Sequence, residues 1–270
     1  MTIPAAAPAS GTPTRRTRRF VPRLGTGGAL YSFALVIGVW WLATVLAPVS
    51  STILPTPLDT ARAFREMARS GVLWTDLAAS LSRAAIGFAI GAGLGVLVGL
   101  LTGRTKLARL LLNPFLAVMR PIPAIALVPV AIVWFGIGEG SKYFVIAYTV
   151  FLAVWFNTHQ GMDYVPDIYI RASRSLATSR LREFFLVVVP AAAPHILAGI
   201  RLGVALAFLS LVAAELTGAS SGIGYRLQEA RQYIRTDRMF ALLIELGLIG
   251  ALIDAAVYRL GRRIVHWQQA

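Results

Sequence analysis

Residues 80–103 read SLSRAAIGFAIGAGLGVLVGLLTG. This apolar run is long enough to cross a membrane, because a bilayer core about 30 Å thick needs roughly 20 helical residues. Within the run a glycine stands at every fourth position, at Gly87, Gly91, Gly95, Gly99 and Gly103. Since four residues turn a helix by about 400°, these glycines form a slowly spiralling groove that a second helix can approach closely. Close helix packing is the favoured interpretation of this stripe, and the lining of a channel is the alternative.

The composition of the whole chain is typical of a membrane protein. Of its 270 residues, 57% are hydrophobic and 14% are charged, and the mean hydropathy is +0.68. Soluble domains carry about a quarter charged residues, so a soluble enzyme is close to excluded. The chain has no cysteine, and His159, His195 and His266 are too scattered for a metal cage. We therefore expect no metal site.

Six apolar runs of suitable length predict an all-α membrane protein with six transmembrane helices. The runs are residues 28–47, 80–103, 114–136, 143–160, 191–216 and 239–259. The third is the least regular, because Pro121, Pro123 and Pro129 each lack a backbone donor and must kink or break a helix. A break inside a membrane is tolerable only where protein or cavity water satisfies the freed carbonyl groups.

The distribution of charge predicts that both chain ends lie in the cytoplasm. The formal net charge is +14. With an inner N-terminus, the inner segments carry a charge near +12 and the outer segments near +2, which is the asymmetry expected of an N-in, C-in protein. Residues 1–27, rich in Ala, Pro, Thr and Arg, are predicted to be a disordered cytoplasmic tail, and residues 28–270 the membrane domain. Nucleic acid is not needed to explain the basic charge.

Residues 163–190, here called the inner loop, are too polar to span the membrane and are predicted to lie on the cytoplasmic side. Ile168, Ala172 and Leu176 fall on one helical stripe, with Arg171, Arg174 and Ser175 around it. Ser179 is a candidate N-cap for a second short helix through Phe184 and Phe185. Two short helices of this kind would offer a projection for a partner protein to hold, or would lie as an amphipathic loop on the lipid headgroups.

Charged residues within the predicted spans are functional candidates, because a charge in the bilayer is costly. The candidates are Arg201, Glu215, Glu245 and Asp254. A structural ion pair between Arg201 and Asp254 is the simpler interpretation. An unpaired Arg201, or Arg120 beside the third span, would instead attract an anion in a substrate pathway. Glu215 is the third candidate for the substrate pathway; it precedes the glycine-rich outer loop and could cap or gate that loop.

Two outer segments, residues 58–67 and 225–233, are predicted to be short interfacial helices. They are candidates for a surface on which a partner docks. Helices that merely lie on the membrane surface are the alternative.

The inner loop resembles the EAA loop of bacterial ABC importer permeases. That pattern has Glu-Ala-Ala, then Gly after three residues, then Ile-x-Leu-Pro after nine more. Here Arg171-Ala172-Ser173, Ala177 and a terminal Pro190 stand at matching spacing. Arg171 replaces the glutamate and Ala177 the glycine, and an alanine would be strained if the turn needs a positive φ. The resemblance implies that the loop couples the permease to an ATPase through Arg171, Ala172, Ser173, Arg174, Leu176, Ala177, Ser179, Arg180 and Pro190.

Further motifs resemble the nitrate/sulfonate/taurine/bicarbonate permease family of ABC importers. They are LPTP at 54–57, SLSR at 80–83, RPIP at 120–123, WFG at 134–136 and ASSGIGY at 219–225. The resemblance implies a type I importer permease in the bacterial inner membrane that works as a homodimer among membrane lipids. It also implies two cytoplasmic ATPase subunits, which bind the ATP and Mg, and a periplasmic or lipid-anchored solute-binding protein. The chain itself has no Walker A pattern, so it is expected to bind no cofactor and to catalyse no reaction.

Two other interpretations stay open at this point. A glycine betaine or choline permease would need an aromatic cage, for which Trp134, Phe135, Trp155 and Phe156 are present near span ends. A six-span channel or secondary carrier would need no ATPase. An intramembrane enzyme has no support, because the sequence shows no paired catalytic carboxylates and no recognisable nucleophile. We expect the solute to be a small anion of the sulfonate, taurine, nitrate or bicarbonate class. The sequence does not decide which of these anions it is.

Overall fold

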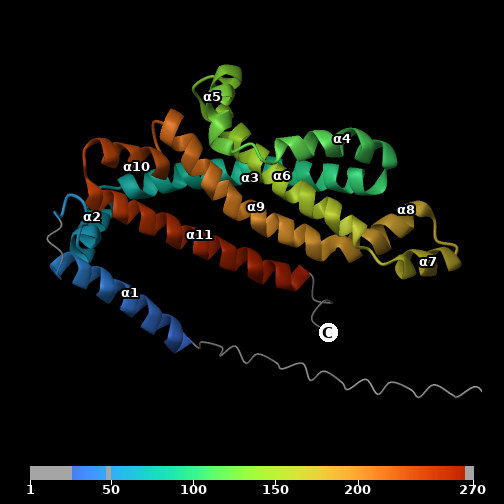
Figure 1. Ribbon diagram of the computed structural model, residues 1–270, viewed down its shortest axis with the longest axis horizontal. Helices are drawn as coiled ribbons and strands as arrows, with labels where there is room; N and C mark the ends of the chain where they lie inside the picture. The colour runs from blue at the N-terminus through green and yellow to red at the C-terminus, as the bar shows by residue number, and fades with distance from the viewer. Residues whose placement is uncertain (1–25, 47–49, 265–270) are drawn as a thin grey trace, which may run out of the picture.

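The computed structural model of the protein describes residues 26–46 and 50–264, and every regular element within these ranges is helical (Figure 1). The predicted tail therefore falls almost entirely outside the described residues. The elements are α1 (Thr26–Leu46), α2 (Pro57–Arg69), α3 (Val72–Arg104), α4 (Lys106–Met119), α5 (Ala124–Phe135), α6 (Glu139–Asp163), α7 (Asp167–Ser175), α8 (Arg180–Glu183), the π-helical turn η1 (Phe184–Val188), α9 (Val189–Gly218), α10 (Ile223–Gln232) and α11 (Thr236–Ile264).

Three long helices of the described chain are apolar enough to cross a membrane: α3, α11 and the continuous helix formed by α8, η1 and α9. The bent pair α4 and α5 makes a possible fourth crossing. The predicted ranges 28–47 and 143–160 are also helical, as α1 and α6, although neither meets the same test of length and composition. Helices thus stand at all six predicted ranges, and one of those ranges holds two helices.

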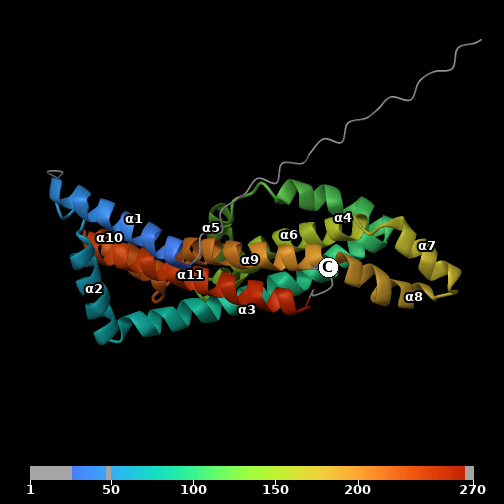
Figure 2. The same cartoon turned by 90° about the horizontal axis from the view of Figure 1, so that it is seen from below.

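Helix α6 forms the centre of the molecule, and α3 and α9 run beside it (Figures 1 and 2). Its Ile146, Val150 and Val154 are fully buried and pack with Ala207 and Leu211 of α9 in one apolar cluster. Because protein surrounds much of α6, this helix needs less apolar surface than a helix that faces lipid. This position accounts for the polar residues that lower its overall hydrophobicity.

The glycine stripe of α3 lies against α6. A Cβ added to Gly87 would lie 2.6 Å from Cβ of Ile146, and one added to Gly99 would lie 2.5 Å from Cβ of Thr158. The facing residues of α6 also repeat every four positions, at Ile146, Val150, Val154, Thr158 and Met162. Each missing side chain on α3 is therefore matched by a side chain of α6, which is the close-packing arrangement. The groove is filled by protein and does not line an open channel.

The range predicted as the third span, 114–136, is not one helix. Helix α4 ends at Met119, and α5 leaves the break at an angle of 105° (Figure 1). The hydroxyl of Tyr148 in α6 donates to the carbonyl oxygen of Met119 at 2.7 Å, so protein satisfies a group at the break. Pro121 and Pro123 separate the two helices as expected. Pro129, in contrast, lies inside α5 without ending it.

The second short helix predicted in the inner loop is the first part of a much longer one. Helix α8 continues without interruption through η1 into α9. The π turn contains a hydrogen bond from the backbone nitrogen of Val189 to the carbonyl of Phe184. This wider turn directly precedes Pro190, whose ring would clash with the carbonyl group four residues earlier in a regular α-helix. The prediction of a separate short helix was wrong, because the π turn lets the helix continue through Pro190.

Four short helices lie at the two opposite ends of the molecule. Helices α2 and α10 lie at one end, while α7 and α8 lie at the other (Figures 1 and 2). The ranges predicted as outer interfacial helices, 58–67 and 225–233, coincide with α2 and most of α10. The segments predicted to lie on opposite sides of the membrane are therefore at opposite ends of the fold.

Replacing Gly95 by alanine should destabilise the protein. The added Cβ would lie 2.8 Å from Cβ of Val154 and 2.9 Å from the carbonyl oxygen of Phe151, so α3 and α6 must separate. Overpacking of this kind costs about 1–3 kcal/mol. We expect a lower midpoint of thermal unfolding for Gly95→Ala in detergent.

Gly93→Ala is the matched control, because nothing lies within 4 Å of a Cβ added at that position. Alanine favours a helix over glycine by up to about 1 kcal/mol, so this variant should unfold at the same or a higher temperature. Equal midpoints for the two variants would contradict the packing described for the stripe.

Candidate functional site

The inner loop ends in an exposed apolar and basic tip. Leu176 is 81% exposed, and Ile168 and Leu181 are exposed as well. Ala172 and the arginines at positions 171, 174 and 180 are also exposed. The predicted stripe of Ile168, Ala172 and Leu176 is therefore not covered by other described parts of the chain. An exposed apolar patch with a basic rim is suited to contact with a partner.

A buried carboxylate holds the two arms of the inner loop together. Glu183 of α8 is buried, and its Oε2 accepts hydrogen bonds from Oγ of Ser173 at 3.1 Å and from Nε of Arg174 at 3.2 Å. Ser173 and Arg174 both belong to α7. These contacts fix α7 against α8, so the tip has a defined shape.

The turn between the two arms contains a strained alanine. Ala177 has a φ of 55°, in the left-handed region that favours glycine. The backbone nitrogen of Thr178 donates to the carbonyl of Ser173 at 3.2 Å, and that of Ala177 to the carbonyl of Arg174 at 3.0 Å. This pair of bonds is the Schellman motif that ends many helices. The resemblance to the EAA loop thus identified a position where glycine is favoured.

The inner loop is attached firmly to the membrane helices. Val165, Val188 and Ala192 form a buried apolar cluster at its base, with Ile170 and Phe184 packed against it. Arg104, the last residue of α3, donates to the carbonyl of Arg180 at 3.2 Å. A displacement of the loop would therefore be carried into α3, α6 and α9.

Ser179 stands at the predicted N-cap position but does not cap the helix with its side chain. Ser179 precedes α8, but its side chain makes no capping hydrogen bond. Its carbonyl accepts the first helical bond, from the backbone nitrogen of Glu183 at 2.9 Å, as the carbonyl of an N-cap residue does. Pro190 lies in the first turn of α9, directly after the π turn of the continuous helix.

At the opposite end, a buried polar cluster surrounds Glu215; we call it the outer network. Glu215 is 1% exposed, and its carboxylate accepts hydrogen bonds from Oγ of Ser80 at 2.8 Å and from Nη1 of Arg83 at 2.7 Å. It also accepts a bond from the backbone nitrogen of Gly224 at 2.9 Å. Glu215 thus caps the start of α10, which is one of the two roles considered for it from the sequence.

Arg83 connects this carboxylate to α6 and to the outer loop, which is the segment 219–222 between α9 and α10. Its Nε and Nη2 donate to the two oxygens of Glu139, at 2.6 and 2.9 Å. Its Nη1 also donates to the carbonyl of Ser221 at 2.6 Å. These donations by Arg83, aided by Lys142, hold the pKa of the Glu139 carboxyl below its usual range, against a smaller opposing effect of burial.

Three acceptors from two membrane helices cap successive backbone nitrogens at the start of α10. Gly222 donates to Oδ1 of Asp76 at 2.7 Å, and Ile223 donates to Oγ of Ser80 at 2.9 Å, beside the bond from Gly224 to Glu215. These groups would otherwise be unsatisfied at a helix N-terminus. The outer loop is therefore tied to α3 and α9.

Sequence reasoning did not assign the roles of Asp76, Ser80 and Arg83. Arg83 lies within the predicted span 80–103, so its charge in a membrane helix was the signal that could have identified it. The partners of Arg83 lie 56 and 132 positions away. Such distant pairing cannot be read from local sequence.

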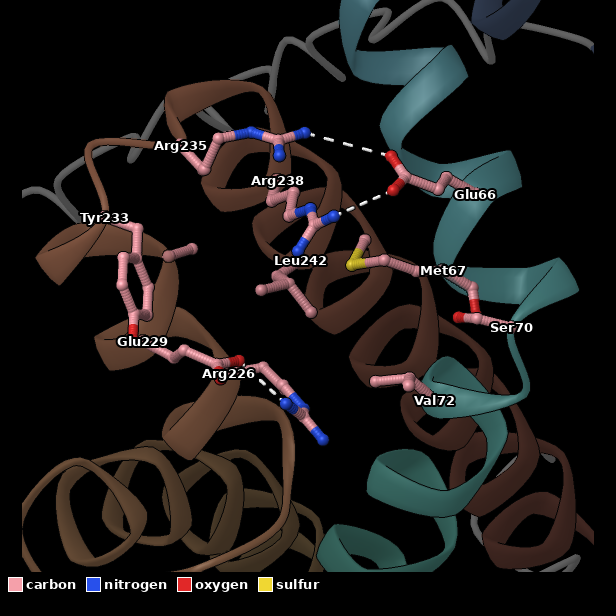
Figure 3. A pocket seen from close by; sticks show the side chains of 11 residues that line it. Glu66, Met67, Ser70, Val72, Arg226, Glu229, Tyr233, Arg235, Arg238 and Leu242 are labelled. Carbon is pink, nitrogen blue, oxygen red and sulfur yellow. Dashed lines mark hydrogen bonds and ion pairs between the residues drawn. The ribbon is translucent and has the colours of Figure 1, made fainter.

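An open pocket of about 500 Å³ adjoins the outer network, between α2, α10 and α11 (Figure 3). The carboxylate of Glu66 in α2 lies 2.8 Å from Arg238 of α11 and 3.8 Å from Arg235, which directly precedes α11. These ion pairs link α2 to α11 at the pocket. Met67 and Leu242 form part of its apolar wall. The pocket combines charged groups with an apolar surface.

The three predicted pathway residues are not brought together. Arg201 makes a two-point ion pair with Asp254, with both distances 2.7 Å, as the simpler interpretation expected. Glu215 belongs to the outer network. Arg120 lies beside the break between α4 and α5, where its guanidinium stacks 3.6 Å from the ring centre of Phe156. The three residues therefore occupy separate environments.

Solved structures with the same fold are ABC transporters. The chain resembles the MetNI methionine ABC transporter in an inward-facing conformation, with a TM-score of 0.56 and 22% identity over 71% of this chain and 94% of that chain. It also resembles an amino acid ABC transporter solved with histidines, with a TM-score of 0.60 and 16% identity over 75% of this chain and 97% of that chain. The fold is that of an ABC importer permease.

The family follows from the sequence comparisons. The chain belongs to the binding-protein-dependent transport system inner membrane components, whose family model matches residues 91–266. It is 40% identical to a putative aliphatic sulfonates transport permease of Bacillus subtilis, over 88% of this chain and 86% of that protein. It is 33% identical to the taurine transport system permease of Escherichia coli (87% and 88%), and 34% identical to the nitrate import permease of a Synechocystis species (73% and 72%).

These findings confirm the family resemblance. The chain is a multi-pass permease subunit of the bacterial inner membrane and not an enzyme, and ATP hydrolysis belongs to a separate subunit of such transporters. Partners of two kinds, an ATPase and a solute-binding protein, are implied by membership of this family. The comparisons do not favour the glycine betaine or choline alternative.

Ala177→Gly should stabilise the inner loop. A left-handed conformation costs an L-residue roughly 1–2 kcal/mol that glycine avoids. Because Ala177 is exposed, the substitution removes little packing. We expect the free energy of unfolding to rise by about 1 kcal/mol. A lower thermal midpoint for Ala177→Gly than for the unchanged protein would contradict the turn described here.

Glu215→Gln should destabilise the protein strongly. The substitution removes a buried charge that faces Arg83 and accepts two further hydrogen bonds, and breaking such a pair costs about 3 kcal/mol or more. Glu66→Gln is the control, because its ion pairs at the outer surface are exposed and worth less than about 1 kcal/mol. Thermal unfolding in detergent should give a lower midpoint for Glu215→Gln than for Glu66→Gln, and the reverse order would contradict the outer network.

Proposed function

We propose that this chain is one of two identical permease subunits of an ATP-driven importer. It crosses the membrane six times, through α1, α3, the bent pair α4 and α5, α6, α9 and α11, with both ends in the cytoplasm. The arrangement of the described helices supports this topology, because α1 and α11 both extend from the end with α2 and α10 towards the end with α7 and α8 (Figure 1). The excess of basic residues in the inner segments supports the same orientation.

The single observation that carries the coupling role is the exposed tip of the inner loop. Leu176 is 81% exposed although α7 is fixed to α8 through Glu183. A rigid element that exposes a large apolar side chain is suited to a preformed partner surface. We assign that partner as the cytoplasmic ATPase, which binds the ATP and Mg, and we assign residues 163–190 as the coupling element.

Movement of the coupling element then drives the transport cycle. Closure of the two ATPases would displace α7 and α8 as a unit, and the apolar cluster at the base of the loop would carry this displacement into α6 and α9. Rigid-body motion at the interface between the two permease subunits opens the pathway alternately to each side. The permease contributes no chemical step to this cycle.

The outer end is the docking surface for a periplasmic or lipid-anchored binding protein. Helices α2 and α10 border the charged pocket of Figure 3, and Glu66, Arg235 and Arg238 surround its opening. The outer network below it ties α10 to α3 and α9. Binding at this surface would therefore act directly on two membrane helices.

The solute is a small anion of the class that includes sulfonates, taurine, nitrate and bicarbonate. The names of the relatives support this assignment, since they are permeases for aliphatic sulfonates, taurine and nitrate. Membrane lipid surrounds the assembly, and nucleic acid has no part in it.

Leu176→Asp should abolish binding of the ATPase. The residue is so exposed that the change costs little stability, but it places a charge in the proposed apolar contact. We expect the tagged variant to reach the membrane and to lose the ATPase that co-purifies with the unchanged permease.

Leu58→Asp provides a control at the opposite end. Leu58 is also an exposed leucine, on α2, and its substitution should leave the ATPase bound. Retention of the ATPase by Leu176→Asp, or its loss from both variants, would contradict the coupling role. Reversal of charge at both Arg174 and Arg180 should reproduce the loss, because both arginines belong to the tip.

A further inference from the structure

A pocket of about 510 Å³ opens on the face formed by the α4–α5 break, α6 and α9. Most of its wall is aliphatic and includes Ile125, Leu152, Leu202, Leu206 and Leu209. The size falls in the range of pockets that enclose small molecules, about 300–1,000 Å³. The pocket is distinct from the outer network and from the inner loop.

The hydroxyl donors in this wall are already used. Thr149 donates to the carbonyl of Val145 at 3.0 Å, and Oγ of Ser210 bonds the carbonyl of Leu206 in its own helix at 2.9 Å. The hydroxyl of Tyr148 donates to Met119 at the helix break. The side-chain amide of Asn157 uses one of its two N–H groups, for the carbonyl of Ala153 at 2.9 Å. None of the three hydroxyls can donate to a solute without losing its present bond.

Arg120 is the exception among the polar groups of the pocket. Its guanidinium stacks on Phe156 at 3.6 Å, and within residues 26–46 and 50–264 it has no carboxylate partner. Stacking on a ring occupies the face of a guanidinium and leaves its N–H groups, which point outward in the plane, free to donate. A charge placed beside a membrane helix needs a compensating group, because apolar surroundings solvate it poorly.

Three other arginines of the membrane helices differ in this respect. Arg83 contacts two carboxylates, and Arg201 is held by Asp254. Arg109, at the inner end of α4, pairs with Asp163 at 2.6 Å. The fold thus neutralises these three cations internally and leaves the guanidinium of Arg120 at the edge of an apolar pocket.

We infer that Arg120 binds the anionic group of the transported solute, while the apolar part of that solute lies against the aliphatic wall of α9. This inference rests on the proposed function and narrows its substrate class to organic anions, such as alkanesulfonates. A planar, five-donor guanidinium suits an oxyanion with two or three equivalent oxygens. Small inorganic anions such as nitrate would leave the aliphatic wall uncovered.

The binding test uses the purified complex of permease and ATPase without the binding protein, so that only the permease site is probed. Hexanesulfonate at millimolar concentration should raise the thermal midpoint of the complex, and nitrate should raise it by less. Arg120→Gln should remove the shift, and Arg120→Lys should retain part of it because lysine keeps the charge but lacks the stacked fork.

Arg259→Gln is the matched control, since it removes an exposed arginine at the end of α11, remote from the pocket. Its response to hexanesulfonate should equal that of the unchanged complex. An equal shift in Arg120→Gln and the unchanged complex would overturn the inference. A shift by nitrate as large as that by hexanesulfonate would overturn the assignment to organic anions.

The transport test uses the full transporter with its binding protein in proteoliposomes. Uptake of labelled hexanesulfonate should fall at least tenfold in Arg120→Gln, while the binding protein should still stimulate ATP hydrolysis. If Arg120→Gln does not assemble, Arg120→Lys is used, and the hexanesulfonate concentration that gives half-maximal uptake is compared with that of the unchanged transporter. We expect a higher value for Arg120→Lys, and an equal value would overturn the inference. Failure of the unchanged transporter to couple ATP hydrolysis to any uptake would instead refute the proposed function. The thermal shift in the binding test is measured without a transport cycle and reports on Arg120 alone.

Discussion

The contact between α3 and α6 positions everything else in the molecule. Five glycines at four-residue spacing allow α6 to approach the backbone of α3, and the facing side chains of α6 repeat at the same interval. Close packing of this kind is effective in a membrane, where lipid is as apolar as the side chains and helices gain little from simple burial. Because the contact runs from Gly87 to Gly103, it fixes the two helices along most of the span.

This fixed pair connects the two candidate sites. At the end with α2 and α10, α3 presents Ser80 and Arg83 to Glu215, and α6 presents Glu139 to the same arginine. At the end with α7 and α8, α3 bonds to the start of α8 through Arg104. A rigid pair that contacts both the outer network and the inner loop is a physical route by which an event at one end can act on the other.

Several features of the fold could be predicted because they depend on neighbouring residues. Hydrophobic runs marked all six helical ranges, Pro121 and Pro123 marked the break, and the spacing around Ala177 marked a turn with positive φ. Two expectations about the inner loop failed. The helix from Arg180 does not end near Phe185, because a π turn before Pro190 lets it continue into α9, and Ser179 stands at the N-cap position without a capping bond from its side chain.

By itself, the sequence determined that this is an all-α membrane protein, where its helices lie, and to which family of importers it belongs, because these properties depend on hydrophobicity and local motifs. Only the tertiary structure decided which charges neutralise one another. Arg201 and Asp254 are 53 positions apart, and Arg83 and Glu215 are 132 apart, so their pairing depends on how the helices pack. The same packing left Arg120 stacked on Phe156 without an acidic partner among the described residues, since no helix brings a carboxylate to the α4–α5 break.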